Sequence, residues 1–210
     1  MNSSRLSSSV ALAAGAASLV LTLAACGSDT ETSSTTTTPA VSDVFTPPSI
    51  VETATAASAC PSTPPQDSGT PEWTLPGATG SVAVTGSTES AAPNIKVEAP
   101  FSVTETQVHT LKAGDGPVVA DTATVSVCYM GVNGRDGSVF DSSYETGAPV
   151  DFPLDGVVPG FQKAIAGQKV GSTVAVAMTS ADGYPEGQPA AGIQPGDSLV
   201  FAIKILDASS

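Results

Sequence analysis

The strongest constraint on the fold is an alternation of apolar and polar residues that recurs through the second half of the chain. Between positions 122 and 130, it places four residues on one face of an extended strand: Ala123, Val125, Val127 and Tyr129. The same period of two recurs at Val174, Val176 and Met178, and again at Leu199, Phe201, Ile203 and Ile205. Short segments of this kind, separated by Gly, Asp, Asn and Pro, are typical of half-buried antiparallel strands.

One segment between these strands follows a helical period instead. Phe161, Ala164 and Ile165 recur at helical spacing directly after Pro159-Gly160. A helix of about two turns is too short to be stable alone and needs a sheet to pack against. The sequence therefore predicts a single α+β domain in which a curved antiparallel sheet covers one short α-helix, without internal repeats.

The N-terminus has the pattern of a secretory signal. Arg5 is followed by an apolar stretch from Val10 to Ala25, which small residues interrupt and which is short for a membrane span. It ends in Leu23-Ala24-Ala25-Cys26-Gly27, which resembles the lipobox of bacterial lipoproteins. We therefore expect a signal peptide over residues 1–25 and a lipidated Cys26 that anchors the protein outside the cytoplasm to the bacterial cell membrane. The alternative is ordinary secretion with an incidental cysteine.

The composition changes twice along the rest of the chain. Residues 26–70 are rich in Ser, Thr, Pro and Ala and hold too little apolar material to fold, so they are predicted to be a disordered tether. Weak alternation over residues 71–104 leaves two alternatives, a β extension that packs on the domain or a linker. Residues 105–208 are the predicted domain.

Composition also excludes several classes of function. The net charge of -13 leaves no basic surface for nucleic acid. The usual hydrolase triads need a histidine base and zinc sites need clusters of His or Cys, whereas this chain has a single histidine, His109. We therefore expect neither a metal nor a cofactor. We interpret His109 as an incidental surface residue of a strand.

Five segments, in order and at their spacing, resemble the FKBP family of peptidyl-prolyl cis-trans isomerases over about a hundred residues. They are Val127-Cys128-Tyr129-Met130-Gly131, Val139-Phe140-Asp141-Ser142-Ser143, Val157-Val158-Pro159-Gly160-Phe161, Val170-Gly171 and Leu199-Val200-Phe201. The resemblance implies a half-barrel of antiparallel strands wrapped around the helix, with a pocket between helix and sheet. It also implies catalytic roles for Tyr129, Phe140, Asp141, Val158 and Tyr184, and substrate contacts for Phe152, Val157, Phe161, Ile193 and Phe201.

Two departures from the family pattern concern this pocket. Phe161 stands where many members have tryptophan, which we expect to alter ligand affinity more than mechanism. Asp182 and Pro185 flank Tyr184 where the family often has an aromatic residue and a glycine, which affects the rim and its sequence preference.

The resemblance implies an enzyme that accelerates rotation about X-Pro bonds in exported proteins. Its partners would be proline-containing polypeptides and macrolides of the rapamycin type, and we expect a monomer. The alternatives are a non-catalytic binding or chaperone module with the same fold, and a β-domain lipoprotein with a structural role in the envelope.

The two cysteines that remain after Cys26 would lie in an oxidising compartment. Cys128 points away from the face that carries Tyr129, so a disulfide with Cys60 would attach the tether or β extension to the back of the sheet. We treat this pairing as a hypothesis.

Overall fold

Antiparallel strands dominate the structure, as the alternating pattern predicts. The computed structural model describes residues 59–65 and 69–209. Their strands are β1 (Trp73–Pro76), β2 (Thr79–Thr85), β3 (Asn94–Ser102), β4 (Gln107–Lys112), β5 (Thr124–Asn133), β6 (Val139–Ser142), β7 (Val150–Pro153), β8 (Thr173–Met178) and β9 (Leu199–Ser209). Their helices are α1 (Ser143–Thr146) and α2 (Pro159–Ile165), with short 3₁₀ turns at Leu154–Gly156, Ser180–Asp182 and Pro189–Ala191. No described helix has the length and apolar character to cross a membrane.

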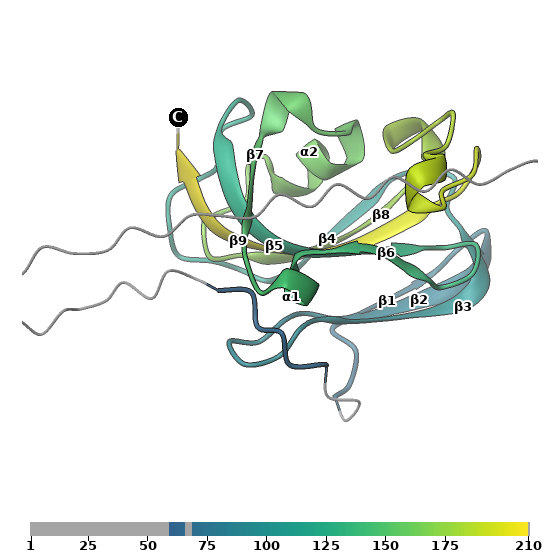
Figure 1. Ribbon diagram of the computed structural model, residues 1–210, viewed down its shortest axis with the longest axis horizontal. Helices are drawn as coiled ribbons and strands as arrows, with labels where there is room; N and C mark the ends of the chain where they lie inside the picture. The colour runs from purple at the N-terminus through teal and green to yellow at the C-terminus, as the bar shows by residue number, and fades with distance from the viewer. Residues whose placement is uncertain (1–58, 66–68, 210) are drawn as a thin grey trace, which may run out of the picture. The chain divides into compact units, whose positions relative to one another are not determined.

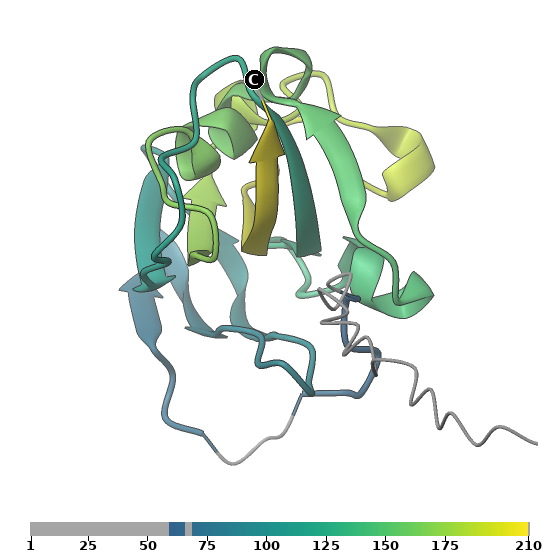
Figure 2. The same cartoon turned by 90° about the vertical axis from the view of Figure 1, so that its left-hand side faces the viewer.

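Six of these strands form one antiparallel sheet around β5. The order is β4-β8-β9-β5-β6, and β7 also pairs with β5. Strand β5 lies beside β9 along its whole length, from Thr124 opposite Ser209 to Asn133 opposite Leu199. Figure 2 shows the C-terminal end of β9 (yellow) next to the start of β5, with β7 on the other side. Strand β5 therefore lies in the middle of the sheet, with paired strands on both sides.

The helix α2 covers the front face of this sheet (Figure 1). It buries Phe161, Ala164 and Ile165, the three residues that the helical spacing identified. Pro159 at the helix start has no amide hydrogen to lose, which suits the first turn. The helix packs on the apolar faces of β5, β8 and β9, so the predicted α+β architecture is present.

A second sheet, β1-β2-β3, covers the back of the first one. Val82, Val84 and Phe101 from this layer pack against the small residues Ala175, Ala177, Val200 and Ala202 on β8 and β9. The prediction of half-buried strands is wrong for β8, because all six of its residues are buried. Ala175 and Ala177 of β8, which we expected to face solvent, lie under this sheet.

His109 of β4 is exposed, and its ring stacks on that of Trp73, with ring centroids 5.6 Å apart.

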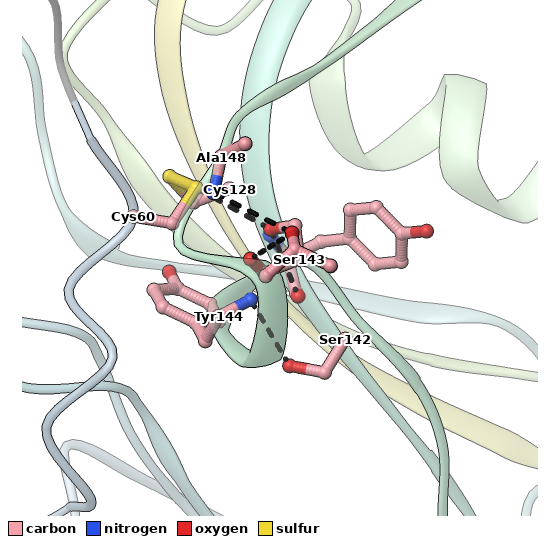
Figure 3. Close-up of a disulfide and its surroundings, with 8 residues drawn as sticks. Cys60, Cys128, Ser142, Ser143, Tyr144 and Ala148 are labelled. Carbon is pink, nitrogen blue, oxygen red and sulfur yellow. Dashed lines mark hydrogen bonds between the residues drawn. A yellow bond between two sulfur atoms is a disulfide. The ribbon is translucent and has the colours of Figure 1, made fainter. Parts of the chain in front are cut away.

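The disulfide that the sequence suggested is present. Cys60 and Cys128 are bonded, and Tyr144 lies beside them (Figure 3). Ala92 belongs to the same buried cluster. The amide of Cys60 also donates to the carbonyl of Gly147, 3.2 Å away. Cys128 therefore faces away from Tyr129, but it is buried rather than exposed. The predicted signal peptide (1–25), Cys26 and the tether up to residue 58 lie outside the described residues.

Candidate functional site

Four aromatic rings from β5, β7, α2 and β9 meet at one end of the front core. The Tyr129 ring lies 5.8 Å from that of Phe152, 5.9 Å from that of Phe161 and 6.4 Å from that of Phe201. Phe161 contacts Phe152 and Phe201 edge to face, at 5.7 and 5.5 Å. These are favourable geometries for aromatic pairs. We call this group, together with Phe140, the aromatic cluster.

The cluster lies where the core meets solvent. Tyr129 keeps 8% of its surface exposed, and Phe161 and Phe201 each keep 5%, whereas Val127 and Ile203 on the same strands are fully buried. Phe140 and Phe152 are only partly buried. The rings therefore keep accessible edges at the surface.

A glycine allows the two rings on the β6 side to approach each other. Phe140 meets Phe201 edge to face with centroids 5.5 Å apart. A Cβ atom on Gly131 of β5 would lie 2.7 Å from both the Cζ of Phe140 and the Cε1 of Phe201. Only glycine fits at this position without moving a ring.

A hydrogen bond ties the cluster to the one acidic residue predicted in the site. The Tyr129 hydroxyl donates to Asp141 Oδ2 over 2.6 Å. Burial raises the pKa of the Tyr129 phenol far above its ordinary value, and the Asp141 carboxylate adds to the effect. The Ser143 hydroxyl accepts from the Tyr129 amide at 2.9 Å and holds the backbone there. The phenol is therefore a fixed, neutral hydrogen-bond donor.

One backbone donor and one side-chain donor at the rim have no partner among the described residues. Val158 immediately precedes α2, and its carbonyl accepts from the helix while its amide donates to no described group. The Tyr184 hydroxyl likewise donates to no described residue, although its ring packs on the core. Val157 and Ile193 complete the rim, with Ile193 buried.

The long segment between β8 and β9 is held by a polar network that sequence reasoning missed. Asp197 accepts from Asn133 Nδ2 at 2.7 Å, from Arg135 Nε at 3.3 Å and from the amide of Gln194 at 2.9 Å. Arg135 also donates to the Gly192 carbonyl at 3.0 Å. In the sequence, Asp197 follows Pro-Gly and resembles an ordinary turn residue, so no local signal identifies its partners.

A salt bridge fixes the other end of this segment. Asp182 pairs with Lys163 of α2 over 2.8 Å and also accepts from Thr106. These hydrogen bonds lower the pKa of the Asp182 carboxyl. This residue, which departs from the family pattern, thus connects the segment carrying Tyr184 to the helix.

All ten residues predicted for the site lie together. Nine belong to the front core or pack against it, and Asp141 is attached to it through Tyr129. The site combines an apolar aromatic wall, one neutral phenol and two unpaired donors. Such a surface is suited to an apolar ring with carbonyl groups beside it.

Comparison with known proteins agrees with this composition. Residues 116–206 match the family model for FKBP-type peptidyl-prolyl cis-trans isomerase. The chain is 37% identical over 101 residues to the FKBP-type 22 kDa peptidyl-prolyl cis-trans isomerase of Escherichia coli, with 48% of each protein covered. It is 35% identical over 96 residues to a probable FK506-binding protein of Corynebacterium glutamicum, covering 45% of this chain and 80% of that protein.

Among solved structures, FkpA from Escherichia coli aligns with a TM-score of 0.47 and 35% identity, over 50% of this chain and 48% of that one. The chain spans about half the length, or less, of the first three curated relatives that it matches, at 48%, 40% and 35%. The family match over residues 116–206 covers β5 to β8, α2 and most of β9.

Proposed function

Because the chain belongs to the FKBP-type peptidyl-prolyl cis-trans isomerase family, we propose that it accelerates rotation about X-Pro peptide bonds. The observation that carries the proposal is the aromatic cluster, in which Phe152, Phe161 and Phe201 surround Tyr129 at the solvent boundary of the core. This arrangement supplies a contact surface for the ring of a proline.

The reaction requires no bond to be made or broken. Rotation is slow because amide resonance must be lost midway, at a barrier of about 18–20 kcal/mol. The twisted amide has less charge separation than the planar one, so it loses less on transfer to an apolar site. Binding the twisted form more tightly is then sufficient for catalysis.

The donors around the cluster suit the carbonyl groups of such a substrate. The Val158 amide would hold one substrate carbonyl, and the Tyr184 hydroxyl would donate to another. The Tyr129 hydroxyl is already engaged by Asp141, so this pair orients the side of the site and places a polar group near the rotating bond.

A protease-coupled isomerisation assay on the full chain tests the proposal. We expect turnover of proline tetrapeptides, inhibition by a macrolide of the rapamycin type, and losses in kcat/KM of about tenfold or more for Phe152→Ala, Phe161→Ala and Phe201→Ala. Trp73→Ala is the control, because it removes an aromatic ring that lies outside the cluster.

Melting temperatures of all variants separate loss of activity from loss of folding. A full chain that folds, yet leaves the isomerisation rate at its uncatalysed value, would contradict the proposal. Binding of proline peptides without turnover would then favour the non-catalytic binding module.

We further propose that the protein is a lipid-anchored monomer that acts on exported polypeptides. The buried Cys60–Cys128 disulfide supports this setting, because such bonds persist outside the cytoplasm. The anchor would be Cys26.

Thiol titration of denatured protein from the cell envelope should find Cys60 and Cys128 oxidised, and metabolic labelling with a fatty acid should require Cys26. Two free thiols at Cys60 and Cys128, or no labelling, would contradict this setting without affecting the proposed reaction.

A further inference from the structure

A cavity of about 450 Å³ lies on the back of the large sheet, away from the aromatic cluster. Its walls are the segment around Cys60, residues 87–89 after β2, the end of β4, the middle of β5 and β9, and Tyr144 of α1. This volume is in the range of small-molecule sites. No role in prolyl isomerisation follows for it, because it shares no residue with the cluster.

Two lysines enter this cavity from one row of residues across the sheet. Lys112 of β4 lies opposite Thr173 of β8, which lies opposite Lys204 of β9, which lies opposite Cys128 of β5. Opposite residues in paired strands present their side chains on the same face. The two ammonium groups therefore flank one sheet position, in a chain with 7 basic and 20 acidic residues.

The positive charge of these lysines is incompletely balanced. Neither Lys112 nor Lys204 forms an ion pair with another described residue. Lys204 Nζ donates only to the Gly171 carbonyl, at 2.6 Å. Burial and the nearby Lys112 lower the pKa of Lys204, whereas Glu89 and Asp115 raise it. Of these two carboxylates only Glu89 lines the cavity, so the lining residues carry two ammonium groups and one carboxylate.

The cavity also contains a buried hydroxyl that lacks a hydrogen bond. Tyr144 is 4% exposed, and its Oη has no partner among the described residues. Burial raises the pKa of Tyr144 to about 12, and a contact with the Ser87 hydroxyl, which does not reach hydrogen-bond geometry, lowers it. Figure 3 shows the Tyr144 ring beside the disulfide. A buried donor of this kind is costly unless something accepts from it.

Part of the remaining wall is apolar, with the polar residues Ser87 and Thr88 beside it. Leu206 and Cys128 line the cavity, and both pack with the Tyr144 ring in one cluster. A ligand that satisfies all these groups has one negative charge, an oxygen acceptor and a compact apolar body.

We propose that this cavity binds a small organic carboxylate, with the anion between Lys112 and Lys204 and the apolar part over Leu206 and the disulfide. The Tyr144 hydroxyl donates to the ligand. One carboxylate balances the single net positive charge of the wall.

Titration of the isotope-labelled full chain with phenylacetate, followed by amide proton–nitrogen spectra, tests this site. We expect saturable shifts at Ser87, Thr88 and Leu206, and no saturable shifts with the neutral analogue phenylacetamide. Absence of saturation with phenylacetate overturns the proposal, as do equal shifts with the amide or shifts confined to the aromatic cluster. Saturation by inorganic phosphate with equal affinity would also overturn it, because the apolar wall would then contribute nothing.

Substitutions in the cavity provide the second measurement. Lys112→Gln and Lys204→Gln should each weaken phenylacetate binding by roughly fivefold, the upper end for an ion pair that is open to solvent. Lys169→Gln is the matched control, because it removes the same charge outside the cavity. Tyr144→Phe should weaken binding by about threefold while the melting temperature stays equal or rises, since the hydroxyl has no partner to lose. Unchanged affinity in all three cavity variants would overturn the assignment.

Discussion

At the scale of single residues, Gly131 controls the geometry of the aromatic cluster although it contributes no side chain to it. Phe140 and Phe201 approach edge to face across the space that a Cβ atom would fill. Both rings lie next to the surface, so neither is held by deep packing alone. Their arrangement therefore depends on the absence of one methyl group.

Gly131→Ala should displace one of these rings and lower kcat/KM several-fold. The cost in unfolding free energy is expected to be about 1–3 kcal/mol, the usual range for an overpacked core position. Gly69→Ala is the control, because its nearest contact from a Cβ atom is 3.9 Å away. Measured kcat/KM and urea denaturation of both variants check the prediction, and equal activity in the two would contradict it.

Tyr144 should make the protein less stable at alkaline pH. Its pKa is raised to about 12 by burial, whereas an unfolded tyrosine titrates near pH 10. Between these values the unfolded chain loses the proton and the folded chain keeps it, so stability is complete below about pH 10 and falls as the pH rises toward 12. Urea midpoints at several pH values should fall less steeply for Tyr144→Phe than for the parent; parallel curves would contradict the prediction.

The residues of the candidate site could be predicted from the sequence to different extents. Tyr129 and Phe201 follow from the period of two, which places them on the core face of their strands. Asp141 and Tyr184 do not, because an Asp before two serines and a Tyr before a proline are ordinary loop residues. They reach the cluster only through contacts between distant segments, which no local pattern encodes.

At the scale of structural elements, the segment between β8 and β9 is positioned by Asp197. This residue is 8% exposed, and it accepts hydrogen bonds from β5, from Arg135 and from its own segment. Burial alone would raise the pKa of Asp197, but the hydrogen bonds from Asn133, Gln194 and Arg135 hold it below its ordinary value. The ionised carboxylate therefore stabilises the fold above the pKa of an unfolded aspartate, and this stabilisation is lost as pH falls through the folded pKa.

Asp197→Ala should leave the buried Asn133 amide and two partly buried donors without their acceptor, and it should release Ile193 from the rim of the cluster. We expect a loss of about 2–4 kcal/mol in unfolding free energy and an increase in KM. Asp207→Ala removes an exposed carboxylate from β9 and serves as the comparison. Denaturation curves of the two variants measure the loss in unfolding free energy, and steady-state kinetics measure the change in KM. An unchanged KM in a folded Asp197→Ala protein would show that the network does not position the rim.

The elements also show where periodicity stops being informative. Alternation predicted one apolar face for β8 and β9, and that face does contact α2. The opposite face consists of Ala175, Ala177, Val200 and Ala202, whose small side chains give little hydrophobic signal. Small residues suit close approach of a second sheet, but the same residues also occur on exposed strands. Sequence pattern alone could not distinguish these cases.

At the scale of the whole molecule, the sheet that carries the aromatic cluster is covered from behind by β1-β2-β3. Phe101 is 2% exposed in this interface, and its amide donates to the Gly134 carbonyl at 2.7 Å. Residues 73–102 therefore share a buried core with the sheet that carries the aromatic cluster. A fragment that starts near Thr104 would expose the row of small apolar residues on β8 and β9.

This covering layer should make the two sheets unfold together. Phe101→Ala is expected to cost about 3–5 kcal/mol in unfolding free energy, because it leaves a cavity between the sheets. Val108→Ala is the control, since that side chain is 39% exposed. Urea denaturation, followed both by far-ultraviolet circular dichroism and by isomerase activity, should show one transition whose midpoint falls in Phe101→Ala alone.

The fragment from Thr104 should bind a hydrophobic dye and melt below the full chain, because its back face is uncovered. Activity that persists through an earlier structural transition would mean instead that the front layer folds independently of the back one.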